Sequence, residues 1–384
     1  MVSISRLLGV RSVLLLLLIS ITFLNWHGYW YVFAVLPIVY ALFMNEVYRY
    51  FDRVTVLIFL FGVWYSVFAT ELSFNAYASF MFIYPMLYLV GKYIGISEDS
   101  NGLVRMLFVV AISMAVMYLF SISIDIAKYG FYSETRNIEI EGRGSDDEIS
   151  ATGIYSHLML LTTFIAALFT RIPWRSKLIY MVFAILAFVV SIRIQSRTSV
   201  VIMIMVVVLS LFVNFRTMIR RHSIIAIFLL GSLFFAANYA LINYEEELGI
   251  LERFQDDDVN TGGYRTELAM DVVNKLSENP WGGFENMAYA HNMWLDCARV
   301  AGIVPLLLLL LITILYIRSL WHMYKLRIDD NSGCNAIMVI MGIALFVYMN
   351  VEPILEGSPL IFAFFTIFLG ILRGRTNRLL GIMG

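Results

Sequence analysis

The chain has 384 residues, of which 60% are apolar and only 14% are Asp, Glu, Lys or Arg, and its net charge is −1. A typical globular protein carries about 25% charged residues, so this composition excludes an ordinary soluble domain. The balanced total charge gives no reason to expect a nucleic-acid partner, and none is predicted.

Long apolar segments follow one another along most of the chain. A hydrocarbon core of about 30 Å needs about 20 mostly apolar residues per helix, and lipid-exposed backbone must satisfy its own hydrogen bonds, which favours helices. We therefore predict one all-α, polytopic membrane domain over residues 1–384. It has about twelve spans, near 7–24, 29–47, 54–70, 76–95, 103–124, 150–170, 178–192, 196–215, 223–243, 291–317, 334–352 and 357–372.

The distribution of charge predicts which loops lie in the cytoplasm. If the N-terminus is cytoplasmic and the spans alternate, the short inner segments contain 18 of the 27 basic residues, and 22 of the 28 acidic residues fall outside. Short cytoplasmic loops are enriched in Lys and Arg. We therefore expect a multi-pass membrane protein with both termini cytoplasmic. The inner basic residues are Arg6, Arg11, Arg49, Arg53, Lys92, Arg105, Arg171, Arg175, Lys177, Arg216, Arg220, Arg221, Arg318, Lys325, Arg327, Arg373, Arg375 and Arg378.

Two outer loops stand out. The first, 125–149, is acidic, and the second, 244–290, is the largest in the chain. Within the second, Leu268, Val272, Val273 and Leu276 recur at helical spacing, which predicts an amphipathic helix over 266–278. Asn279-Pro280 ends this helix and Gly282-Gly283 turns the chain toward the next span.

His291 and Asn292 follow this loop directly and are predicted to open the span 291–317. Imidazole titrates near neutral pH, so His291 can take a proton from a hydroxyl nucleophile; the alternative is an interfacial histidine that binds a loop carbonyl. Asn292 can cap the helix or orient a sugar. His157, near the outer end of its span, is a further candidate for the lining of the same cavity.

Three arginines are predicted on the outer side, where topology disfavours basic residues. Arg193 and Arg197 lie four residues apart at a hairpin and share a face if that segment is helical. Guanidinium groups bind phosphate in a bidentate manner, although snorkelling to lipid headgroups is the alternative. Arg265 is a second candidate phosphate ligand, or pairs with nearby acids such as Asp256 to Asp258 or Glu267.

No metal site is predicted, because neither cysteine has metal-ligating neighbours and the acidic runs in the second loop are typical of solvated loop charge. Cys297 and Cys334 are expected near opposite membrane faces, which excludes a disulfide between them. Both are predicted to be packing residues of helices.

These segments resemble the bacterial O-antigen ligase and polymerase superfamily of membrane glycosyltransferases. The resemblance rests on four motifs in a fixed order. Ser196-Arg-Thr198 begins a mid-chain span, and Arg265 stands at the start of the predicted helix in the large outer loop. Asn279-Pro-Trp-Gly-Gly283 follows that helix, and His291-Asn with Leu295 comes before Gly302-Ile303. Glu352-Pro353 and Glu356 also match its C-terminal region. The likeness covers residues 190–370, and Val304-Pro305 departs from it where the family often has a second glycine.

The resemblance implies a GT-C-like fold in a bacterial inner membrane and a reaction at its periplasmic face. Undecaprenyl-pyrophosphate-linked glycan is the donor, and another lipid-linked glycan is the acceptor. His291 takes the proton of the acceptor hydroxyl, while Arg197 and Arg265, with Arg193, stabilise the departing pyrophosphate. Direct displacement inverts the anomeric carbon without a cofactor or metal. Membrane lipids and a chain-length regulator are the further partners expected.

The sequence leaves other functions open. A ligase that transfers finished glycan to lipid A–core has the same motifs, and the polymerase is favoured because the N-terminal half matches only in hydropathy. A lipid-linked glycan flippase or solute transporter predicts ionisable residues near mid-membrane and two related halves. Neither feature is evident in the sequence.

Overall fold

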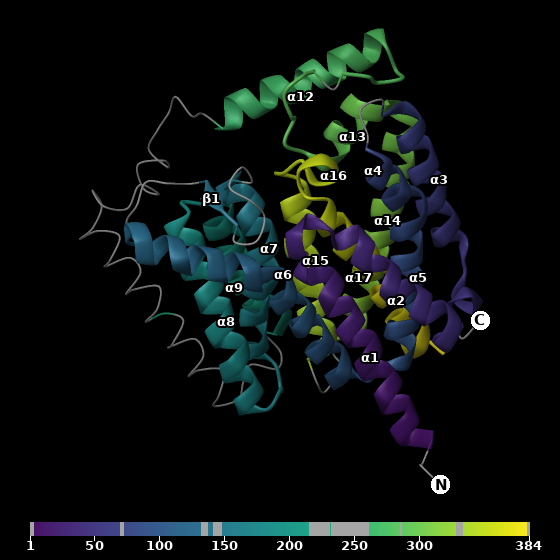
Figure 1. Ribbon diagram of the computed structural model, residues 1–384, viewed down its shortest axis with the longest axis vertical. Helices are drawn as coiled ribbons and strands as arrows, with labels where there is room; N and C mark the ends of the chain where they lie inside the picture. Colours follow the sequence, from purple (N-terminus) through teal and green to yellow (C-terminus); the bar gives the residue numbers. More distant parts are fainter. Residues whose placement is uncertain are drawn as a thin grey trace. The chain divides into compact units, whose positions relative to one another are not determined.

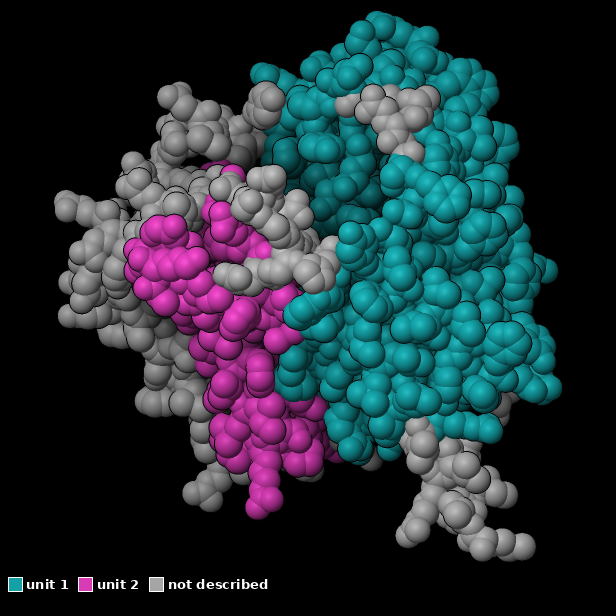
Figure 2. Space-filling view, viewed as in Figure 1, with its two compact units in different colours: residues 1–114, 265–323, 349–384 teal, residues 115–264, 324–348 magenta. Residues whose placement is uncertain are grey.

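The computed structural model describes residues 4–69, 73–131, 137–140, 148–214, 231, 261–284, 286–327 and 333–381. The chain divides into two compact units (Figure 2). Unit 1 comprises residues 1–114, 265–323 and 349–384, and unit 2 comprises residues 115–264 and 324–348. Each unit is described by itself below.

The regular elements in the described part of unit 1 are all helices, and they are labelled in Figure 1. Its N-terminal elements are α1 (Ile4–Leu24), the short 3-10 turns Trp26–Gly28 and Val47–Tyr50, α2 (Trp30–Asn45), α3 (Arg53–Phe68), α4 (Phe74–Ala78), the π-turn Ser79–Ile83 and α5 (Tyr84–Ser97). Its later elements are α12 (Thr261–Glu278), α13 (Met293–Ala301), α14 (Ile303–Leu326), α16 (Ile354–Gly357) and α17 (Pro359–Leu379).

Unit 2 contains one small hairpin among its helices. α6 (Ser100–Tyr129), of which residues 100–114 belong to unit 1, leads into it, and α7 (Ala151–Thr163) continues into the 3-10 turn Phe164–Phe169. The other helices are α8 (Trp174–Arg193), α9 (Arg197–Asn214) and α15 (Cys334–Met349), and the strands β1 (Ile138–Glu139) and β2 (Glu148–Ile149) pair antiparallel. Because α6 extends to Tyr129, the predicted outer loop 125–149 begins about one helical turn later than expected.

The helices confirm an all-α protein with several apolar spans. Six helices in the described residues are long and apolar enough to cross a membrane: 74–97, 100–129, 174–193, 197–214, 303–326 and 359–379. Five shorter apolar helices, 11–24, 30–45, 53–68, 153–169 and 334–349, coincide with predicted spans. The predicted span 223–243 lies outside the described residues, so the total of twelve stays a prediction.

The prediction of one continuous helix over 291–317 is wrong. The segment forms two helices, α13 and α14, which are separated at Gly302 with φ 80° and ψ −166°. Such a backbone conformation is accessible to glycine and excludes continuation of an α-helix. The apolar residues on both sides of the break explain why hydropathy alone joins the two segments. His291 therefore lies before α13 and does not begin the membrane span.

Helices α5 and α17 approach each other closely through glycines. A Cβ at Gly91 would lie 2.0 Å from the Ile367 carbonyl oxygen, and one at Gly370 would lie 2.1 Å from that of Tyr88. Gly95 and Gly374 make equivalent contacts one turn further along. Small residues let membrane helices pack backbone against backbone, and this register makes the two helices parallel.

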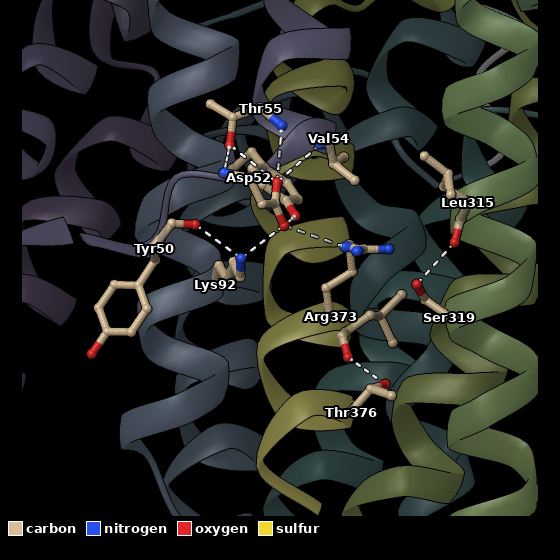
Figure 3. Close-up of polar contacts among 11 residues, drawn as sticks. Tyr50, Asp52, Val54, Thr55, Lys92, Leu315, Ser319, Arg373 and Thr376 are labelled. Atoms are coloured by element: carbon tan, nitrogen blue, oxygen red, sulfur yellow. Dashed lines mark hydrogen bonds and ion pairs between the residues drawn. The ribbon is translucent and has the colours of Figure 1, made fainter. Parts of the chain in front are cut away.

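A cluster of ion pairs and hydrogen bonds joins three helices at one end of unit 1 (Figure 3). Asp52 caps α3 through the backbone N–H groups of Val54 and Thr55 at 3.0 and 3.1 Å. Its carboxylate also accepts from Lys92 Nζ of α5 at 2.7 Å and lies 3.8 Å from Arg373 Nε of α17. Lys92 and Arg373, both predicted to be cytoplasmic, thus gather at the same end of three helices.

Candidate functional site

The site lies at the other end of unit 1, in the segment 279–302, where two stretches of backbone pair. Gly283 N–H donates to the Val300 carbonyl at 3.0 Å, and Ile303 N–H donates to the Pro280 carbonyl at 2.9 Å. Trp281 stacks on Phe68 at the last residue of α3, with ring centroids 5.5 Å apart. Helix α12 ends at Glu278, as predicted, so the Asn-Pro-Trp-Gly-Gly turn is held against the end of α13.

Gly282 and Gly302 permit this pairing because both have φ near +80° and no side chain. A Cβ at Gly282 would lie 2.4 Å from the Gly302 nitrogen, and one at Gly302 would lie 2.4 Å from the Pro280 oxygen. These distances are far below any real Cβ contact. Gly282 and Gly302, which are 20 residues apart in the sequence, therefore lie where the two paired backbone segments come into direct contact.

A buried arginine fixes the loop between this turn and His291. Arg299 is 1% exposed and donates to the carbonyl oxygens of Phe284 and Met287, both at 3.1 Å. Its guanidinium also forms an ion pair with Glu356 of α16 and lies 3.5 Å from Asp296. A buried charge is tolerated only when it is paired and hydrogen-bonded, and Arg299 meets both conditions.

Asp296 orients the backbone on both sides of His291. Its buried carboxylate accepts from Ala290 N–H at 2.8 Å and from Asn292 N–H at 3.1 Å. His291 between them has φ 51°, a left-handed conformation that non-glycine residues adopt rarely. The two hydrogen bonds hold this conformation, which is the kind of local strain that clusters at functional sites.

The His291 ring faces Glu352. His291 Nδ1 lies 4.0 Å from Glu352 Oε2, and the two side chains are 34% and 5% exposed. Neither His291 Nδ1 nor Glu352 Oε1 has a hydrogen-bond partner among the described residues, although both atoms are buried. This distance exceeds a hydrogen bond, but catalytic contacts often tighten only when substrate binds.

The electrostatics of this pair suit proton transfer near neutral pH. Burial, with a smaller effect of the Arg265 charge, lowers the pKa of His291, so its imidazole is neutral at pH 7. Burial raises the pKa of Glu352 to about 7, although Arg265 acts in the opposite direction. Titratable pairs with displaced pKa values are typical of catalytic sites.

Arg265 and Asn292 lie at the same site. Arg265 of α12 donates to the Val351 carbonyl at 3.1 Å, beside Glu352, and Figure 1 shows α12 lying across this end of unit 1. The predicted partners Asp256 to Asp258 lie outside the described residues. Asn292 caps α13 by accepting from Trp294 and Leu295 N–H groups at 3.1 and 3.2 Å, as one of its two predicted roles requires.

The amphipathic character of α12 is confirmed only in part. Leu268 and Val272 are buried, and Leu276 is half-buried. Val273, which the spacing placed on the same face, is 49% exposed, as is its neighbour Met270 at 54%. Helix α12 therefore buries a narrow stripe and leaves an apolar edge uncovered within the described residues.

The other two arginines belong to unit 2. The condition for Arg193 and Arg197 to share a helical face is not met, because α8 ends at Arg193 and α9 begins at Arg197. The turn between them contains Gln195 with φ 54°. The Arg193 side chain is fully buried in an ion pair with Asp125 of α6, whereas Arg197 is half-buried.

His157 is buried in unit 2 with both ring nitrogens engaged. Its Nε2 lies 3.1 Å from the Tyr118 hydroxyl, and its Nδ1 lies 2.8 Å from the Ser156 hydroxyl and 2.9 Å from the Gly153 carbonyl. The ring also stacks on Tyr118 at 4.1 Å. These contacts give His157 a packing role between α6 and α7.

Three residues of the site were not singled out from the sequence. Glu352 was noted only as part of the family resemblance, and Asp296 and Arg299 only as part of the segment after His291. The signal that could have found the last two is a charged pair at i, i+3 within an otherwise apolar segment. Cys297 and Cys334 are free and buried. Among the described residues, no group of three metal-ligating side chains comes together.

No protein-family model matches the chain, and a search of curated proteins finds no match. The functional argument therefore rests on the geometry around His291 and on the motifs of the sequence.

Proposed function

We propose that the chain is a membrane glycosyltransferase that polymerises surface polysaccharide from undecaprenyl-pyrophosphate-linked repeat units at the periplasmic face. The observation that carries this proposal is the pairing of His291 with the buried Glu352, next to Arg265, in a loop that Asp296 and Arg299 hold in place. Such an arrangement joins a base, a group that orients the base, and a cation for phosphate.

His291 acts as the general base in this reaction. With Nδ1 toward the Glu352 carboxylate, Nε2 takes the proton of the acceptor sugar hydroxyl as its oxygen bonds to the anomeric carbon. The bond from that carbon to the pyrophosphate oxygen breaks, and its electron pair leaves with undecaprenyl pyrophosphate. Glu352 stabilises the imidazolium that forms, which is the role of the carboxylate in a catalytic triad.

Arginines stabilise the leaving group. Arg265 is the guanidinium beside His291 and Glu352, and its positive charge already affects both of their pKa values. Arg197, half-buried at the start of α9, is proposed as a second phosphate ligand. Arg193 contributes less to this role, because its guanidinium is buried against Asp125. With the Arg265 guanidinium beside the pyrophosphate, the displacement needs no metal and inverts the anomeric centre.

The proposal includes a GT-C-like protein of about twelve spans in a bacterial inner membrane, with both termini cytoplasmic. Two observations in unit 1 support this orientation. Lys92 and Arg373, predicted inside, meet at Asp52, whereas His291 and Glu352 lie near the opposite ends of α3 and α17. The cluster of Lys92 and Arg373 at one end of unit 1 and the loop that carries His291 at the other end agree with the positive-inside rule.

Deletion of the gene from its host separates the polymerase from the ligase. Loss of a polymerase leaves lipid A–core that carries a single repeat unit, because ligation of unpolymerised glycan continues. Loss of a ligase leaves bare core, with glycan retained on the carrier lipid. Gel electrophoresis of the surface glycolipids distinguishes the two patterns, and an unchanged ladder contradicts both functions.

Glu352→Gln is expected to lower turnover and to change its pH dependence. In the wild type, turnover rises with pH through about 7 as Glu352 ionises, although the apparent value belongs to the His291–Glu352 pair. In the variant, the acidic limb moves below pH 6.5, to the lowered pKa of His291. The pH–rate profile of purified protein measures this shift, and an unchanged profile removes Glu352 from the mechanism.

The unfolding temperature of Glu352→Gln is the control for its effect on turnover. The folded-state pKa of Glu352 lies above the ordinary value of 4.5, so the folded protein binds the additional proton and stability falls as pH rises from about 4.5 to 7. Glutamine removes the cost of a buried charge at pH 8. Glu352→Gln is therefore expected to unfold at an equal or higher temperature at pH 8 while it turns over more slowly. A purely structural role predicts a lower unfolding temperature.

A further inference from the structure

Unit 1 contains a cavity of about 650 Å³ that the reaction above does not use. Its walls come from the start of α2, the end of α3, α4 and the turn after it, and α16, and Figure 2 shows the face of unit 1 hollowed where Figure 1 places α4 and α16. The cavity also includes Tyr289, two residues before His291, and Glu356, four residues after Glu352. Its volume lies within the range of about 300–1,000 Å³ that is usual for small-molecule sites.

Six aromatic side chains line the cavity. They are Trp30, Tyr31, Tyr65, Phe80, Tyr84 and Tyr289. Trp30 stacks on Tyr84 with centroids 5.9 Å apart, and Phe80 contacts both Tyr65 and Tyr84 at 4.5 and 5.1 Å. This cluster is buried and fixed in place, whereas Tyr31 and Tyr289 are more exposed. The aromatic surface that a ligand can reach therefore belongs to Tyr31 and Tyr289, and the buried cluster lies beneath it.

The polar lining is neutral. Tyr31 accepts a hydrogen bond from Asn75 Nδ2 at 3.0 Å, which leaves its own hydroxyl proton and the Asn75 carbonyl oxygen available. Ser73 and Ser79 add hydroxyls. The carboxylate of Glu356 is neutralised by Arg299, and none of the described residues that line the cavity is a lysine or arginine.

We propose that this cavity binds a neutral sugar ring, and, resting on the proposed function, that the ring belongs to the acceptor glycan. The C–H face of a pyranose carries partial positive charge and packs on the negative face of an aromatic ring. Its hydroxyls need the mixed donors and acceptors that Tyr31, Asn75 and the serines provide. The donor sugar is attached to pyrophosphate, and the described lining of the cavity offers no cation for that group, whereas Arg265 lies elsewhere in the site.

Saturation-transfer NMR on the purified full-length protein tests the proposal. The protein is held in lauryldimethylamine oxide, whose headgroup contains no sugar. The probes are methyl glycosides of glucose, galactose, mannose, rhamnose, N-acetylglucosamine and N-acetylgalactosamine. At least one is expected to receive saturation from aromatic protons, and glucose 6-phosphate is expected to bind at least 10-fold more weakly than the best neutral probe.

Two variants and one control locate the binding. Tyr31→Ala and Asn75→Ala are each expected to weaken binding of the best probe by at least 10-fold, since they change the exposed lining and leave the buried aromatic cluster intact. Tyr48→Ala removes an exposed tyrosine outside the cavity and is expected to bind as the wild type does. Absence of binding by every glycoside, equal binding by the variants, or displacement of the probe by phosphatidylglycerol overturns the proposal.

This experiment is independent of catalysis. His291→Asn, in which the new residue tolerates the left-handed backbone at this position, is expected to bind the probe as tightly as the wild type, because His291 does not line the cavity. If the transferase function fails while Tyr31→Ala still abolishes sugar binding, the cavity remains a sugar site and only its assignment to an acceptor falls.

Discussion

Replacement of His291 by alanine is expected to lower the turnover of glycan transfer by about 10²–10⁴-fold, the range that general acid–base groups contribute. No second histidine in unit 1 faces Glu352 within the described residues. Turnover depends on a neutral imidazole, which the lowered pKa of His291 supplies at pH 7. Purified variants compared at saturating lipid-linked donor measure the loss directly.

The left-handed backbone of His291 requires a second variant, since alanine at φ 51° can disturb the loop. Asparagine tolerates this conformation better than most residues, so His291→Asn keeps the fold while it removes the base. His322→Ala, at a half-buried histidine of α14, is the matched control and is expected to retain wild-type turnover. Retention of wild-type turnover by His291→Asn excludes His291 as the base.

Arg299→Met is expected to destabilise the protein by about 3–5 kcal/mol, because the buried carboxylate of Asp296 and the half-buried one of Glu356 lose their shared cation. Arg299 links Glu356 of α16 to the carbonyl oxygens of Phe284 and Met287. The variant lacks these contacts, so the loop 284–292 that carries His291 is no longer held in place. Asp296, which orients the backbone around His291, loses its neighbouring charge as well. Thermal unfolding in detergent and the rate of proteolysis within residues 284–292 measure the effect.

Lys275→Met is the matched control for Arg299→Met. Lys275 forms an ion pair with Glu278 at 3.6 Å on the exposed face of α12, with side chains 51% and 70% exposed. Exposed pairs contribute about 0–1 kcal/mol, so this variant is expected to unfold close to the wild-type temperature. If the two variants unfold at the same temperature, the loop does not depend on the Arg299 network.

Hydropathy predicts the membrane helices of this chain well, because a span must be long and apolar regardless of its neighbours. Hydropathy does not predict where a helix is interrupted. The chain around Gly302 stays apolar, and the break arises from contact with Pro280 and Trp281, about 20 residues earlier. A local measure of hydrophobicity contains no information about that contact, so α13 and α14 were joined in the prediction.

The site shows the same division between local and long-range information. Asn292 as a helix cap and Asn279-Pro280 as a helix end follow from neighbouring residues, and the structure has both. The contact of His291 with Glu352 joins residues 61 positions apart, and that of Arg193 with Asp125 spans 68. A single sequence contains no signal for such pairs, so Arg193 was predicted as a phosphate ligand without its buried carboxylate partner.

The most direct test of the account is transfer by the purified protein alone, reconstituted in liposomes with undecaprenyl-pyrophosphate-linked repeat units. The account predicts a ladder of longer glycans and one equivalent of undecaprenyl pyrophosphate released per bond formed, and both are lost in His291→Asn. Movement of intact lipid-linked glycan across the bilayer without new glycosidic bonds contradicts the account and identifies a flippase instead.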